Sequence, residues 1–284
     1  MAGLMTAALP APFEPLASGA AQALASILMV KGVLCFGSLA MGTYDEQSDV
    51  DLYVLSAPRI LEAGLRQAVL ASLPGVEGLE IDYAQPGWVG AWNPQSDRLR
   101  LNGIWLDVTY NTLAWLQTVV RKVRRGATSI PEMRFRPYSM LGLLEYSIIL
   151  YDPDGLLERL RAGLYPYPVQ LKQRLVEQNL TQCRDSLADL QDYAQRGIGN
   201  RAFHFHLERC LDGLDGLLFG LNERYPPAVK RVEQVLGKLP RLPHGFMPRY
   251  TALLETPLTP LGRVKIVKEL ASILDEVIEA GTQT

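Results

Sequence analysis

The sequence predicts an α+β protein, in which a small mixed β-sheet with packed helices is followed by an all-α helical bundle. Three observations support this class. Short apolar runs separated by turn residues fill the first two-fifths of the chain, long helical patterns fill its second half, and an arginine-rich stretch lies between them. We expect two domains, residues 1–117 and residues 137–284, joined by a basic linker over residues 118–136. A length of 284 residues suits two domains of ordinary size.

The first half alternates between helical and extended patterns. Apolar residues recur at helical spacing over residues 17–29 and lead into an apolar run at residues 33–36, which ends at Gly37. A helical turn is expected next. The elements expected after it are a strand over residues 50–55, a helix over residues 59–73, and extended stretches over residues 78–84 and 99–110. In the last stretch the two-residue period of a strand places on one face Leu101, Gly103, Trp105, Asp107 and Thr109.

No strand is expected after residue 116. The stretch from residue 118 to 136 is rich in arginine and has a single acidic residue, Glu132, which indicates a linker, or an exposed helix followed by a loop. Beyond it, proline-rich breaks separate long helical patterns, as is typical of a helical bundle. These patterns cover residues 138–151, 169–196, 201–224, 228–239 and 260–280.

Composition excludes several classes of protein. Lys and Arg number 28 against 30 Asp and Glu, a formal charge of -2 that gives no general attraction to nucleic acid or to an anionic membrane. The three cysteines are widely spaced and odd in number, which favours a reducing compartment over a disulfide framework. The apolar N-terminus has no Lys or Arg before Lys31, unlike a secretory signal. We therefore expect a cytoplasmic protein with no membrane or nucleic-acid partner, and the oligomeric state is left unpredicted.

The segment from residue 36 to 54 has the pattern of a phosphate-binding turn. A strand leads into Gly37 and Ser38 at the start of a short helix, where glycine lets the backbone approach a ligand closely. Free N–H groups at the start of a helix favour an anion such as phosphate, and the Ser38 hydroxyl adds a donor. Ser48 then introduces the next strand.

Asp49 and Asp51 are two residues apart on that strand, so their carboxylates project from one face. Two carboxylates beside a phosphate would repel it unless a divalent metal lay between them. Mg²⁺ takes oxygen ligands and bridges carboxylates to substrate phosphates. Because a pair of metal ions can activate an attacking hydroxyl and stabilise a leaving pyrophosphate, we expect two Mg²⁺ ions as the cofactor.

These residues resemble the signature of the DNA polymerase β-like nucleotidyltransferase superfamily. The resemblance extends over about residues 17–116. The matching positions are Gly37, Ser38, Gly42, Ser48, Asp49, Asp51 and Leu52. The superfamily places a third carboxylate on a later, neighbouring strand. Asp107 matches that position, and Asp82 on the preceding strand is the competing candidate.

The resemblance implies transfer of a nucleoside monophosphate, AMP from ATP, to a hydroxyl group with release of pyrophosphate. The catalytic, metal-binding residues that it implies are Asp49, Asp51 and Asp107. The residues that it implies for positioning the triphosphate are Gly37, Ser38 and Ser48. A cleft between the two domains is expected to hold the nucleotide and the acceptor.

The helical half resembles, more loosely, the C-terminal domains of aminoglycoside adenylyltransferases and other small nucleotidyltransferases. An Asn-x-x-Tyr-x-Pro-x-x-Lys run ends at Lys230, which this resemblance places within reach of the triphosphate; a solvated lysine is the alternative. Acidic residues at helical spacing, Glu208, Asp212 and Asp215, favour a polyamine-like acceptor. The alternative is a solvated face paired to nearby arginines.

We therefore expect an enzyme that modifies a small hydroxylated molecule such as an aminoglycoside. The alternatives are adenylylation of a protein or an RNA, as in toxin–antitoxin pairs, and a catalytically silent nucleotide-binding protein. Three carboxylates are admissible as the general base that deprotonates the acceptor hydroxyl: Glu145, Glu208 and Asp107.

Overall fold

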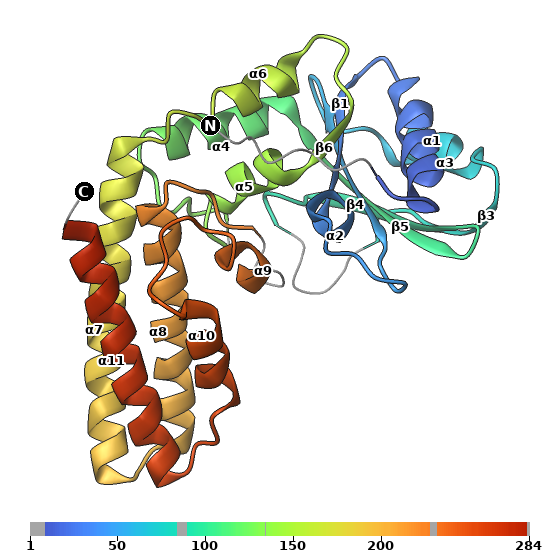
Figure 1. Cartoon of the computed structure of the whole chain (residues 1–284). Coiled ribbons are helices and arrows are strands. Elements are labelled where there is room, and N and C mark those ends of the chain that lie inside the picture. Colours follow the sequence, from blue (N-terminus) through green and yellow to red (C-terminus); the bar gives the residue numbers. More distant parts are fainter. Residues whose placement is uncertain (1–8, 84–89, 134, 228–231, 283–284) are drawn as a thin grey trace. The chain divides into compact units, whose positions relative to one another are not determined.

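The computed structural model describes residues 9–83, 90–133, 135–227 and 232–282, and the chain divides into two compact units, Met1–Pro166 and Tyr167–Thr284 (Figure 1). The first unit contains a mixed β-sheet with its helices, and the second is helical. This order of elements confirms the α+β class. Within the described residues, no helix combines the length and the apolar character that crossing a membrane requires.

The sheet of the first unit has six strands in the order β3-β4-β5-β2-β1-β6. The pair β2 and β5 runs parallel, and the other neighbouring pairs are antiparallel. The strands are β1 (Val30–Phe36), β2 (Val50–Ser56), β3 (Val76–Glu80), β4 (Gln95–Leu101), β5 (Ile104–Thr112) and β6 (Ile148–Tyr151). The parallel pair matters most for function, because its register sets Asp51 directly opposite Asp107.

One face of this sheet forms the core of the unit. Helices α1 (Phe13–Ala25) and α3 (Ala63–Ala71) lie side by side and cover that face (Figure 1). Alternate strand residues point toward them, and Leu52 and Val108 are fully buried there. The intervening residues of β2 and β5 point to the opposite face, and the Asp51 carboxylate is among them.

A hairpin divides the stretch that the sequence presents as one extended segment over residues 99–110. β4 ends at Leu101, Asn102 and Gly103 form the turn with φ of 49° and 82°, and β5 follows. A two-residue hairpin turn of type I′ has positive φ at both turn positions, which Asn-Gly adopts at little cost. The expectation that Leu101 and Gly103 share a face with Asp107 is wrong, because Leu101 is buried in the core on the other face.

The first unit continues well past residue 117, where the sequence suggests a domain boundary. Helix α4 (Leu113–Arg124) occupies the start of the expected linker, and it buries Val120 and Val123 while its basic residues stay exposed. Helix α5 (Ser139–Tyr146), β6 and helix α6 (Leu156–Ala162) also belong to this unit. The two compact units therefore meet in sequence at Pro166, well beyond the expected linker.

The helix expected over residues 138–151 is shorter, and a strand follows it. The helix ends at Tyr146, and the next residues form β6, which pairs antiparallel with β1. Ile148 and Ile149 are β-branched and favour a strand, and β1 would otherwise present an unpaired edge. The expectation of no strand after residue 116 is therefore wrong.

The second unit is built on two long helices, α7 (Val169–Arg196) and α8 (Asn200–Leu221), which pack together along their length (Figure 1). Their bounds agree closely with the helical patterns of the sequence. The unit also contains α9 (Val232–Leu236), α10 (Phe246–Glu255) and α11 (Pro260–Thr282). Helix α10 was not expected from the sequence, because Pro248 lies in a proline-rich stretch that resembles a break between helices. In the structure Pro248 lies in the first turn of α10, where proline is tolerated.

Candidate active site

Three carboxylates meet on the sheet face opposite α1 and α3. Asp51 lies on β2, Asp49 directly precedes that strand, and Asp107 lies on β5. One carboxylate oxygen from each lies within 4.8 Å of the others, and all three residues are partly exposed. The structure thus brings together the three residues that the sequence proposes as metal ligands. Asp82, the competing third carboxylate, is bound instead by Arg66, whose Nη2 donates to Asp82 Oδ1 at 2.6 Å.

Asp107 has a basic neighbour on the next strand. Arg98 on β4 lies opposite Asp107 in the antiparallel pairing, and its Nε donates to Asp107 Oδ1 at 2.8 Å. Burial raises the pKa of the Asp107 carboxyl, Arg98 lowers it, and the negative charge of Asp49 raises it again. Clustered negative charge is therefore unfavourable here without a cation.

The donor set fits a hard divalent cation. All three side chains offer carboxylate oxygen, the ligand type that Mg²⁺ prefers, and they leave space for substrate oxygens because none is fully buried. We find no further group of three such ligands among the described residues. Asp49, Asp51 and Asp107 are the residues that would hold the metal.

The Gly-Ser turn packs directly against Asp51. Gly37 starts helix α2 (Gly37–Met41) with a φ of 75°, and a Cβ added to it would lie 2.2 Å from Asp51 Oδ2. Glycine is therefore needed both for the left-handed backbone and for the room that the carboxylate takes. Ser38 follows it and is buried at 7% exposure. The turn and the carboxylates form one continuous site.

Ser48 has a structural role in the loop before Asp49. Its hydroxyl accepts a hydrogen bond from the Asp45 N–H at 2.9 Å and donates to Asp45 Oδ1 at 3.1 Å. These two bonds close the turn that delivers the chain to β2. Contact of Ser48 with a triphosphate stays a prediction.

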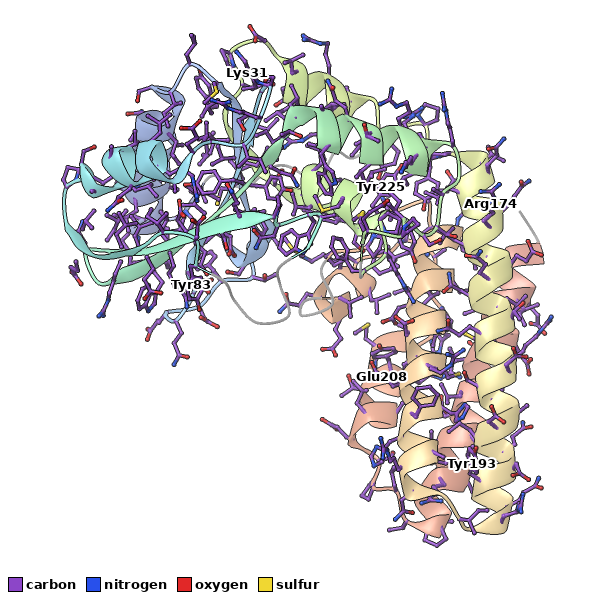
Figure 2. The ribbon with its side chains drawn as sticks, turned by 180° about the vertical axis from the view of Figure 1, so that it is seen from behind. Lys31, Tyr83, Arg174, Tyr193, Glu208 and Tyr225 are labelled. Atoms are coloured by element: carbon purple, nitrogen blue, oxygen red, sulfur yellow. The ribbon has the colours of Figure 1, made fainter. Side chains whose placement is uncertain are left out.

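Glu145 and Glu208, which the sequence also proposes, are not part of this cluster. Lys230 lies outside the described residues. Glu145 on α5 accepts a hydrogen bond from the Tyr165 hydroxyl at 2.6 Å. Glu208 is exposed on α8 of the second unit (Figure 2). Of the three candidate general bases, Asp107 is the member of the carboxylate cluster.

A polar network beneath the site was not expected. Tyr53 follows Asp51 by two residues on the same face of β2 and is fully buried, and its hydroxyl donates to the Trp92 carbonyl at 2.5 Å. Asn111 on β5 donates from Nδ2 to the Tyr53 hydroxyl oxygen and to the Ala91 carbonyl. The network holds the segment before β4 against the sheet. Burial raises the pKa of Tyr53, so its hydroxyl keeps the proton that this bond uses.

The comparison with protein families agrees with this geometry. Residues 18–84 match the family model of the nucleotidyltransferase domain, and this range contains the Gly-Ser turn, Asp49 and Asp51. The protein is a nucleotidyltransferase. Its general activity is the transfer of a nucleotidyl group. Asp107 lies beyond the matched range, so its place in the cluster comes from the fold.

A solved structure of a nucleotidyltransferase-like protein from Exiguobacterium sibiricum is similar to this nucleotidyltransferase. The two chains are 14% identical, the TM-score is 0.44, and the alignment covers 92% of this chain and 74% of the other. No protein of curated function matches the sequence.

Proposed function

We propose that this nucleotidyltransferase uses Mg²⁺ to transfer a nucleoside monophosphate, AMP from ATP, to a hydroxyl group of an acceptor, releasing pyrophosphate. The observation that carries the proposal is the cluster of three carboxylates, one oxygen of each lying within 4.8 Å of the others. The cluster lies beside the Gly-Ser turn, which is so close that a Cβ on Gly37 would clash with the Asp51 carboxylate. Asp49, Asp51 and Asp107 would hold the metal. When bound, the metal neutralises the charge that develops on the α-phosphate and on the leaving pyrophosphate.

The protein contributes positioning and a base. The partly exposed backbone at Gly37 and the Ser38 hydroxyl would orient the triphosphate. Asp107 would take the proton of the acceptor hydroxyl, whose oxygen forms the new bond to the α-phosphorus as the bond to the β-phosphate breaks. Arg98 engages Asp107 Oδ1, and no hydrogen bond to Oδ2 is found among the described residues, so Oδ2 is the atom for this task.

An aminoglycoside as the acceptor stays a prediction from the sequence, as do ATP as the donor and a cytoplasmic location. The acidic stripe that favours an aminoglycoside is partly engaged within the helical unit. Asp212 accepts from Gln182 Nε2 at 3.1 Å, and Asp215 accepts from the Tyr250 hydroxyl at 3.3 Å. These contacts give the stripe a structural role that needs no cationic ligand.

Calorimetry with the non-hydrolysable analogue α,β-methylene-ATP tests the proposal. We expect binding to the wild type only with Mg²⁺, and loss of binding in the Asp49→Asn/Asp51→Asn variant. Glu46→Gln is the matched control, because Glu46 is an exposed acid of the same loop that lies outside the cluster. Equal binding by all three proteins, or binding that ignores Mg²⁺, would contradict the proposal.

A further inference from the structure

A basic and aromatic surface continues the carboxylate face across β4 and β5. Arg98 lies opposite Asp107, and Arg100 lies opposite Trp105, so all four side chains share that face. Trp105 is 42% exposed, unusual for so large an apolar ring. Tyr83, which follows β3, completes the surface (Figure 2). We call Arg98, Arg100, Trp105 and Tyr83 the arginine surface.

Aromatic rings hold the two guanidinium groups in place. The Arg98 Cζ atom lies 4.9 Å from the centre of the Tyr83 ring and 4.8 Å from that of Trp105. Arg98 Nη1 also donates to the Tyr83 hydroxyl oxygen at 3.0 Å. The Arg100 Cζ atom lies 5.8 Å from the centre of the Trp105 ring. Guanidinium groups packed on rings in this way lose less freedom when they bind a ligand.

Several N–H donors of the arginine surface are available. Arg98 uses Nε on Asp107 and Nη1 on Tyr83. Arg100 uses Nε, which donates to the Gly103 carbonyl at 3.2 Å and lies 3.6 Å from Glu77 Oε2. In the part of the chain that the structure describes, Arg98 Nη2 and both terminal nitrogens of Arg100 have no hydrogen-bond partner. Phosphate and carboxylate groups are the ligands that such a fork of donors binds with two parallel hydrogen bonds.

The strand order places this surface across the carboxylate strands from the Gly-Ser turn. Gly37 follows β1 and Arg98 lies on β4, with β2 and β5 between them. Three strand spacings are about 14 Å, so a triphosphate at the Gly-Ser turn would have to cross both carboxylate strands to reach Arg98. Attacking and leaving oxygens are roughly in line in such transfers. With the triphosphate at the Gly-Ser turn, as the proposed function has it, in-line attack brings the acceptor from the side opposite the pyrophosphate, over β5 and β4.

We propose that the arginine surface binds a phosphate group of the acceptor, so that the acceptor is a phosphorylated hydroxyl compound: a ribonucleotide at the end of an RNA strand or a small sugar phosphate. The inference rests on the proposed function and gives its acceptor a chemical class. A polycationic aminoglycoside would meet two guanidinium groups beside the base, which is unfavourable. Glu77 and Glu80 lie on β3 at the outer border of the surface, and a bound phosphate replaces Glu77 beside Arg100.

Two variants with opposite expected effects on acceptor affinity test this assignment, and neither changes a metal ligand. Arg100→Gln removes the donors, and Glu77→Gln removes the acid that competes for Arg100. The full chain is first saturated with Mg²⁺ and α,β-methylene-ATP, and each variant must bind this pair as the wild type does. Acceptor affinity is then measured by fluorescence anisotropy with a 5′-labelled RNA pentanucleotide that has a free 3′-hydroxyl. Ribose 5-phosphate, ribose and kanamycin serve as competitors.

We expect Arg100→Gln to weaken binding of the phosphorylated probe about tenfold, as the loss of a charge-assisted contact does, and Glu77→Gln to strengthen it. Ribose and kanamycin should compete poorly. Strong competition by ribose 5-phosphate would identify the acceptor as a small sugar phosphate, and weak competition would identify it as the end of an RNA strand. Either result supports the proposal. Three results would overturn this inference alone: Arg100→Gln binds the RNA probe as tightly as the wild type, kanamycin competes as well as ribose 5-phosphate, or a protein that binds α,β-methylene-ATP fails to bind the probe. Failure of analogue binding itself overturns the proposed function as well.

Discussion

Replacing Gly37 by alanine separates two effects that the structure combines at one residue. The φ of 75° places Gly37 in the left-handed region, where an L-residue costs about 1–2 kcal/mol. The added Cβ would also lie 2.2 Å from Asp51 Oδ2 and 3.2 Å from its Cγ. Because the struck atoms are the end of a side chain, we expect the Asp51 carboxylate to move out of the cluster while the fold survives.

Gly42→Ala is the matched control for this substitution. Gly42 ends helix α2 with a φ of 67°, and a Cβ added there meets nothing within 4 Å. Both variants should lose about 1–2 kcal/mol of the free energy of unfolding in urea, from the backbone alone. Only Gly37→Ala should also lose Mg²⁺-dependent binding of α,β-methylene-ATP in calorimetry. Equal nucleotide binding by the two variants would refute the claim that Gly37 makes room for Asp51.

Substitutions at three further positions test the residues that support the site. Arg66→Met should lower the free energy of unfolding in urea by about 3–5 kcal/mol, because it leaves the fully buried Asp97 carboxylate without its ion-pair partner. A loss below about 1 kcal/mol would contradict this. Arg98→Gln should move the acidic limb of the pH profile of kcat/KM to higher pH, because Arg98 lowers the pKa of Asp107. Arg98→Lys should move that limb less. A limb that stays in place would argue against Asp107 as the base. Tyr53→Phe should cost about 1–3 kcal/mol in thermal or urea unfolding, because it removes the hydroxyl that donates to the Trp92 carbonyl and accepts from Asn111 Nδ2. No loss would show that the network is dispensable.

Local signals explain why much of the site could be predicted from the sequence. The Gly-Ser turn and the Asp-x-Asp spacing lie within one loop and one strand, so their geometry follows from turn chemistry and the two-residue period of a strand. Helix α7 (Val169–Arg196) was equally accessible, because a long apolar stripe repeats many times along it.

The remaining features depend on strand register, which no short segment of sequence contains. Arg98 is a partner of Asp107 only because the Asn102-Gly103 hairpin sets β4 and β5 in that register. The Asn-Gly pair is a strong hairpin signal, and with it the two strands and their cross-strand pairs could have been predicted. The pairing of β6 with β1 joins residues more than a hundred positions apart and had no such signal.

The most direct test of the central claim follows the fate of the phosphorus atoms of ATP. The protein is incubated with Mg²⁺, a phosphorylated acceptor such as the RNA pentanucleotide or ribose 5-phosphate, and ATP labelled on either the α- or the γ-phosphorus. Nucleotidyl transfer predicts that label enters the acceptor from the α-position alone, that chelation of Mg²⁺ stops it, and that Asp51→Asn abolishes it while Glu46→Gln does not. Label entering from the γ-position, or transfer that survives in Asp51→Asn, would contradict the account.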